Sequence, residues 1–173
     1  MHPMPDRRSQ PTMHHMLLTG SGLIDAERAF DRAARGRRRS ALMGRLRGRR
    51  PERLEVFDER CAQHPRAGLA LREIPLDAIR GTLEPSRAAM FDGAFRPSRA
   101  AQSRWQRVWL AETRGAVLPP ISVIRIGDEY AVRDGHHRVS VARDHGRTTI
   151  DAEVVELVPR PRGGPPLAAP PAG

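Results

Sequence analysis

Apolar residues recur at helical spacing twice near the N-terminus, first over residues 26–33 and again over residues 42–46. This spacing predicts helical structure from about residue 25 to residue 50, and we expect Gly36 to divide it into two helices. A further short helix is predicted over residues 52–61. Residues 25–61 are therefore expected to be mainly helical.

After Gly68 the pattern becomes that of a compact mixed domain. Residues 69–74 are typical of a strand, and Pro75 can open one helical turn that ends near residue 79. Residues 81–97 contain several prolines and glycines and are predicted to be a loop. Ser98 is a candidate N-cap for a helix that ends near Arg114, with both tryptophans on its inward face.

The remaining elements are predicted from the alternation of apolar and polar residues, which indicates strands, and from glycines, which indicate turns and helix ends. Residues 121–126 and 129–133 form a predicted hairpin around Gly127. The helix that follows is expected to end at Gly146, which can adopt the left-handed conformation of a C-cap. Residues 149–158 alternate as a last strand. Helices and strands together predict an α+β, or mixed α/β, fold.

Composition divides the chain into four segments. Residues 1–16 are expected to be a disordered leader, and residues 17–66 a basic helical extension. Residues 67–158 form the predicted compact domain. Residues 159–173 are rich in Pro, Gly and Ala, and we expect a disordered tail.

Charge and cysteine content narrow the classes of function. All 30 basic residues are arginine and the formal net charge is +10, which favours acidic partners such as nucleotides and nucleic acid. One cysteine, Cys61, excludes an intrachain disulfide and a cysteine-based zinc site. No apolar run resembles a signal peptide or a membrane span, so we expect a cytoplasmic protein without membrane contact.

Arginines cover the polar face of the predicted N-terminal helices. They are interpreted either as a solvated surface in an arginine-rich chain or as a surface that contacts DNA. Contact with DNA would be non-specific and would weaken as salt increases. The candidates are Arg37, Arg38, Arg39, Arg45, Arg47, Arg49 and Arg50.

The segment with the clearest chemistry is Asp134-Gly135-His136-His137-Arg138, between a predicted strand and a predicted helix. Gly135 permits a tight turn and a close approach of the backbone to a ligand. The free N–H groups and dipole at the start of the helix attract anions, and His137 and Arg138 add donors suited to phosphate. The segment predicts a phosphate-binding corner, with an ordinary Asp-Gly surface turn as the alternative. Adjacent histidines diverge on a helix, so no metal site is expected.

Three segments, taken in order, resemble the ParB/sulfiredoxin superfamily, specifically the N-terminal domain of ParB-type chromosome-partitioning proteins. They are residues 74–79 (Ile-Pro-Leu-Asp-Ala-Ile), 118–123 (Leu-Pro-Pro-Ile-Ser-Val) and 135–139 (Gly-His-His-Arg-Val). The similarity covers roughly half of the chain, about residues 71–157. It implies a small mixed sheet flanked by helices. It also implies a nucleoside triphosphate, CTP or ATP with Mg²⁺, at the corner and beside Arg87.

The chain also departs from this superfamily. Sulfiredoxin has a reactive cysteine where this chain has His136, so sulfinic-acid reduction is not expected. The Asp-Gly-x-His-Arg form is similar to that of free-serine kinases on the same fold, which implies that the Asp and His of the motif, here Asp134 and His137, assist phosphate handling. His136, at the position of the sulfiredoxin cysteine, could donate to a phosphate oxygen or exchange a proton near neutral pH. Glu84 is the candidate second carboxylate. The candidate catalytic residues are therefore His136, Asp134 and Glu84.

These observations leave three functions open. The first is a nucleotide- or phosphate-binding ParB-like domain, DNA-associated or regulatory, with weak NTPase activity. The second is a small-molecule kinase or a nuclease on the same fold, in which a base and a carboxylate for magnesium would be required. The third is a non-catalytic interaction module. The expected partners are a nucleotide, DNA and a second copy of the chain in a homodimer.

Overall fold

The computed structural model describes residues 22–50, 53–58 and 62–159 of the 173-residue chain. The predicted leader, the predicted tail apart from residue 159, and Cys61 lie outside the described residues. In the described part, no helix combines the length and the apolar character that a membrane crossing requires.

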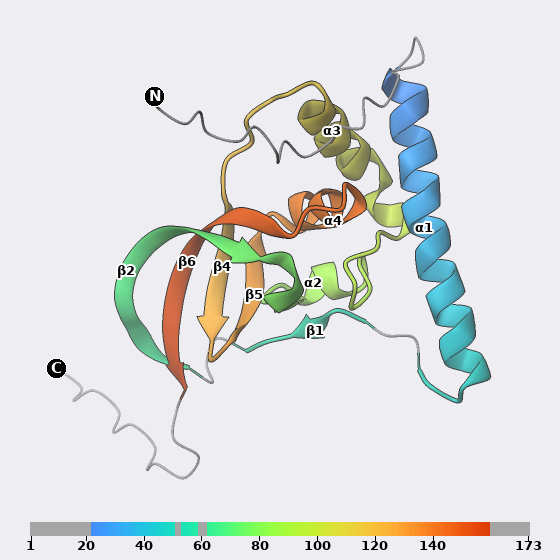
Figure 1. Ribbon diagram of the computed structural model, residues 1–173. Helices are drawn as coiled ribbons and strands as arrows, with labels where there is room; N and C mark the ends of the chain where they lie inside the picture. Colours follow the sequence, from blue (N-terminus) through green and yellow to red (C-terminus); the bar gives the residue numbers. More distant parts are fainter. Residues whose placement is uncertain (1–21, 51–52, 59–61, 160–173) are drawn as a thin grey trace, which may run out of the picture.

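A mixed sheet of six strands in the described residues forms the centre of the molecule (Figure 1). Its spatial order is β1-β3-β5-β4-β6-β2. The strands are β1 (Glu55–Val56), β2 (Ala62–Pro75), β3 (Ile79–Thr82), β4 (Ile121–Ile126), β5 (Glu129–Asp134) and β6 (Thr149–Pro159). β4 and β5 form the predicted hairpin, and β2 pairs antiparallel with β6, while the other three pairings are parallel. The mixed α/β class expected from the sequence is confirmed.

Four α-helices and two 3-10 helices are described around this sheet. The α-helices are α1 (Gly22–Leu46), α2 (Pro85–Ala88), α3 (Gln102–Thr113) and α4 (His136–Asp144). The short 3-10 turns cover Leu76–Ala78 and Arg99–Ala101. In Figure 1, α3 and α4 lie between the sheet and the long helix α1. The helical turn predicted after Pro75 and the helix end predicted at Gly146 are both observed.

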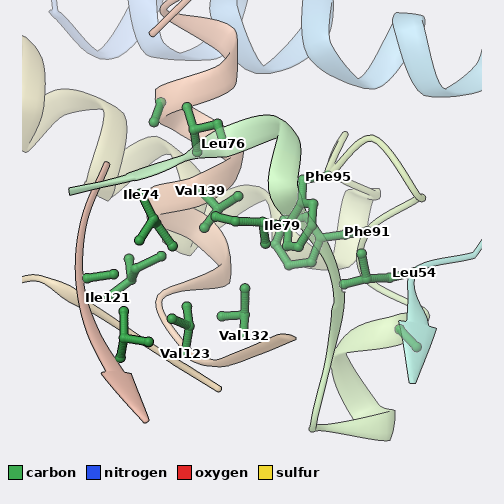
Figure 2. Close-up of a cluster of buried hydrophobic side chains, with 14 of the residues drawn as sticks. Leu54, Ile74, Leu76, Ile79, Phe91, Phe95, Ile121, Val123, Val132 and Val139 are labelled. Atoms are coloured by element: carbon green, nitrogen blue, oxygen red, sulfur yellow. The ribbon is translucent and has the colours of Figure 1, made fainter. Parts of the chain in front are cut away.

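The first apolar core lies between the sheet and α4. Val123 of β4 is in register with Val132 of β5 and with Val154 of β6, and all three side chains are buried. Val139 of α4 packs in the same cluster, as does Phe91, which precedes α3 (Figure 2). Because the paired strands place valines on one face, α4 has a continuous apolar surface to cover.

The second core joins α1 to α3 and α4. Phe30 of α1 meets Trp105 of α3 edge to face, with ring centroids 5.6 Å apart. Trp105 Nε1 donates to Ser140 Oγ of α4 at 2.9 Å, so the indole is satisfied although it is fully buried. Trp109 is buried here as well. Both tryptophans therefore belong to the core, as the sequence predicted.

The N-terminal helix differs from the prediction. It is one continuous helix, Gly22–Leu46. A Cβ at Gly36 would lie 3.3 Å from Arg96 Cδ. The glycine therefore makes room for the Arg96 side chain, and it does not interrupt the helix. Leu42 and Leu46, expected on an inward face, are exposed.

The predicted helix over residues 52–61 is wrong. Residues Glu55–Val56 form a strand parallel to β3, which buries Leu54. Gly81 of β3 makes this close approach possible, since a Cβ there would lie 2.4 Å from Glu55 O and 2.5 Å from the Phe57 ring. The prediction of a loop over residues 81–97 is only partly right, because this segment contains the end of β3 and the short helix α2.

We expect Phe30→Ala to lower the free energy of unfolding by about 3–5 kcal/mol, because it empties the contact between α1 and Trp105. Leu42→Ala, on the exposed part of the same helix, is the matched control and should change it by no more than about 0.5 kcal/mol. Urea denaturation followed by tryptophan fluorescence measures both. Equal effects in the two variants would contradict this account of how α1 is anchored.

Candidate functional site

The predicted phosphate corner is a left-handed turn between β5 and α4. Gly135 has φ 104°, and a Cβ there would lie 2.5 Å from Ile121 Cγ2. Both facts restrict the position to glycine. α4 begins at His136 without a side-chain cap, so the first N–H groups of this nine-residue helix are open to a ligand.

His136 is directed into the protein. Its side chain is buried, and its Nε2 is 2.7 Å from Thr82 Oγ1 at the end of β3. That hydroxyl also accepts a hydrogen bond from Glu84 N at 2.9 Å. The imidazole stacks against Phe91 and Phe95 on the core side. His136 therefore links the start of α4 to β3.

His137 is also buried, and its ring meets Phe91 edge to face at 5.2 Å. Its Nε2 is shielded from solvent and has no hydrogen-bond partner among the described residues. Buried polar atoms in folded proteins are normally paired. This atom is therefore a hydrogen-bonding group for which the described chain supplies no partner.

Burial, more than any other factor, lowers the pKa of both imidazoles from about 6.5 to about 4. The Arg87 guanidinium adds to the lowering for His136, and Arg104 adds to it for His137. Asp134 opposes the shift of His136 without cancelling it. Both rings are consequently neutral at pH 7 and act there as hydrogen-bonding groups without charge.

Arg138 holds the loop that precedes β4. Its Nη1 donates to the carbonyl oxygens of Pro119 and Pro120, the latter at 2.8 Å, and its Nη2 donates to Asp134 Oδ2 at 2.8 Å. The side chain is only 14% exposed. Arg138, the predicted phosphate donor, thus also stabilises the loop before β4. Arg138→Ala would therefore alter the conformation of this loop as well as the binding of any ligand.

The two candidate carboxylates are both in ion pairs. Asp134 pairs with Arg138, and Glu84 Oε2 lies 3.1 Å from Arg87 Nε. Arg87 lines the same cavity as the corner, whereas Glu84 is not part of its wall. The structure therefore brings Asp134 and Arg87 to the corner and leaves Glu84 behind Arg87.

A cavity of about 280 Å³ lies over the start of α4. Its wall is formed by Arg87, Arg104, Val108, Leu118, Pro119, Asp134, Gly135, His136, His137 and Arg138. Three guanidinium groups and one carboxylate give it a net formal charge of +2 with neutral histidines. Such a cavity attracts anions.

Arg104 is the charged member of this wall that the sequence did not predict. It comes from α3, is exposed, and has no ion pair with any described residue. No pattern in the sequence distinguished it from Arg107, another exposed arginine of α3. Among the described residues, no three His, Cys, Asp or Glu side chains are grouped as metal ligands.

The arginines of the N-terminal extension fall into two groups. Arg37 is half-buried and donates to the carbonyls of Met90, at 2.8 Å, and Ala89, at 3.1 Å, so it fastens α1 to the end of α2. The others are exposed and have no side-chain partner among the described residues. They are Arg38, Arg39 and Arg45 on α1, and Arg47, Arg49 and Arg50 just after it.

The lowered pKa values have a measurable consequence. Between about pH 4 and 6.5 the unfolded chain binds more protons at His136 and His137 than the folded chain does. The stability that they contribute is therefore complete above pH 6.5 and is lost as the pH falls through 4. We expect NMR titration to show both imidazoles neutral at pH 5.5. A ring that titrates near pH 6.5 would contradict the burial described for it.

Comparisons with known proteins give a partial resemblance. No protein family model matches the chain, and no curated protein sequence matches it. Among solved structures, the chain is similar to sulfiredoxin from Arabidopsis thaliana, with 23% identity and a TM-score of 0.36. The match covers 49% of this chain and 83% of the sulfiredoxin.

Proposed function

We propose that the corner binds the phosphate group of a small phosphorylated ligand, with a nucleoside triphosphate as the leading candidate. The observation that carries this proposal is the cavity over the start of α4, which Arg87, Arg104 and Arg138 line with one carboxylate, Asp134. The N–H groups at the start of α4 and these guanidinium groups supply the hydrogen-bond donors for phosphate oxygens.

The size of the cavity favours recognition of the phosphate part alone. About 280 Å³ is slightly below the range of roughly 300–1,000 Å³ that is usual for complete small-molecule sites. Leu118, Pro119 and Arg138 also line a neighbouring cavity of about 490 Å³. A sugar and base would therefore extend across this shared wall, outside the corner itself.

Binding is favoured over phosphoryl transfer or nuclease chemistry. Transfer would require a carboxylate for Mg²⁺ and a base beside the acceptor. Both candidate carboxylates are already paired with arginines, and His136 is hydrogen-bonded to Thr82. The groups at the corner are thus arranged to hold an anion, and a regulatory nucleotide-binding domain is the function we propose.

We expect Arg104→Gln to weaken phosphate or nucleotide binding about tenfold. This is the lower end of the roughly 1.5–3 kcal/mol of a hydrogen bond to a charged group, because Arg104 is exposed. Arg107→Gln is the matched control, an exposed arginine on the same helix that does not line the cavity. Calorimetry with inorganic phosphate, pyrophosphate, CTP and ATP, with and without Mg²⁺, measures the effect. Absence of binding by every one of these ligands would overturn the proposal.

A second proposal concerns the exposed arginines at the C-terminal end of α1. Because Arg38, Arg39 and Arg45 are exposed and have no ion pair among the described residues, they are free to neutralise DNA phosphates. Removal of the whole extension is a poor test, since Phe30 anchors α1 in the second core. Point substitutions test the surface and keep that anchor.

We expect the Arg38→Gln, Arg39→Gln, Arg45→Gln triple variant to bind duplex DNA more weakly, with a shallower salt dependence. The slope of log K against log salt should fall by up to about 0.9 for each lost phosphate contact. Fluorescence anisotropy at several salt concentrations measures it. A control with Arg72→Gln, on β2, should keep the parental slope. The same slope in the triple variant would mean that these arginines are only solvated.

A further inference from the structure

A second cavity, of about 690 Å³, lies at the opposite end of α4 from the phosphate corner. Its wall includes Leu76 and Ile79 on either side of the turn into β3, Ala94, Thr148 and Arg143 of α4. It shares no lining residue with the corner cavity. Its volume is within the usual range of small-molecule sites.

Arg143 is held rigidly in this wall. Its Nη2 donates to Leu76 O at 2.5 Å and to Ile79 O at 3.0 Å, and its guanidinium lies 5.0 Å from the centroid of the Phe95 ring. Nη1 and Nε have no partner among the described residues. A guanidinium fixed in this way binds an anion with little loss of conformational freedom.

The residue beneath Arg143 is in a strained conformation. Among the described residues, Phe95 is the non-glycine residue with a positive φ, 59°, and its side chain is buried. Asp92 maintains this turn, because its Oδ1 accepts from Ala94 N at 3.1 Å and from Arg96 N at 2.8 Å. Strain of this kind persists only where the surroundings enforce it, and it is common at ligand sites.

The charges of the cavity define the class of ligand. Arg80, Arg143 and Arg147 line it with a single carboxylate, Asp77, which gives a net formal charge of +2. Burial is the main cause that lowers the pKa of Arg143 from its ordinary value; Arg80 adds to the lowering, whereas Asp77 and Asp92 oppose it. Pro75, Leu76, Ile79 and Ala94 supply apolar surface beside these cations.

We propose that this cavity is a second ligand site, which binds a small organic anion. The carboxylate or phosphate head group of the ligand accepts hydrogen bonds from Nη1 and Nε of Arg143. Its apolar body contacts Leu76, Ile79 and Ala94. Arg80 contributes attraction across the opening, where its own ion pair with Glu129 is long, 3.6 Å, and exposed. This site is independent of the phosphate proposed for the corner.

The test is an NMR titration of the full chain with benzoate, phenyl phosphate and the neutral analogue benzyl alcohol. We expect benzoate or phenyl phosphate to shift the amide signals of Gly93, Ala94 and Thr148 in a saturable way, and benzyl alcohol to leave them unchanged. The difference between the two anions identifies the preferred head group. Shifts confined to residues 135–138 would place binding at the corner alone and overturn the second site, as would equal binding of the alcohol.

Amino-acid substitutions distinguish a loss of ligand binding at this site from damage to the fold. Arg143→Gln also removes the hydrogen bonds to Leu76 and Ile79, so the second variant is Ala94→Leu, which reduces the cavity volume and keeps the Arg143 side chain. We expect Ala94→Leu to weaken the anion at least tenfold and Arg80→Gln to weaken it about threefold. Arg72→Gln, an exposed ion-paired arginine outside the cavity, should leave it unchanged. Parental affinity in Ala94→Leu would overturn the proposal.

Discussion

At Gly135 the chain leaves β5 with φ 104° and enters α4 so close to β4 that a Cβ would lie 2.5 Å from Ile121 Cγ2. This contact fixes where α4 begins relative to the sheet. From there Arg138 reaches the carbonyls of Pro119 and Pro120 and holds the loop that forms one wall of the corner cavity. All three features thus depend on the absence of a Cβ at residue 135: the direction of α4, the hydrogen bonds of Arg138 to the loop, and the cavity proposed to bind an anion.

The sequence predicted those elements whose determinants are local. The β4–β5 hairpin and the end of α4 follow from alternation and from Gly127 and Gly146, which both have positive φ as expected. It did not predict β1, because a two-residue strand depends on close contact with Gly81, more than twenty positions later. Nor did it predict that α1 continues through Gly36, where the glycine makes room for the Arg96 side chain. Tertiary contacts override local propensity at both positions.

In the candidate site, too, the sequence predicted what is local and did not predict what depends on tertiary contacts. A contiguous segment such as residues 134–138 is visible in the sequence, but the direction in which its side chains point is not. His136 turns inward because Thr82, on another strand, accepts or donates a hydrogen bond there. Burial then keeps both histidines neutral, so the positive charge of the corner comes from arginines. Guanidinium groups stay protonated throughout the physiological range, and the attraction for an anion therefore does not depend on a histidine switch.

The two cavities are connected by the body of α4 and by one aromatic ring. Phe95 stacks on His136, with centroids 6.5 Å apart, and its ring also lies 5.0 Å from the Arg143 guanidinium. His136 and Arg143 stand at opposite ends of the same nine-residue helix. Displacing Arg143 would disturb the packing of Phe95, which is buried and has a positive φ. Phe95 thus contacts one residue of each cavity wall, His136 and Arg143, although the two walls share no residue.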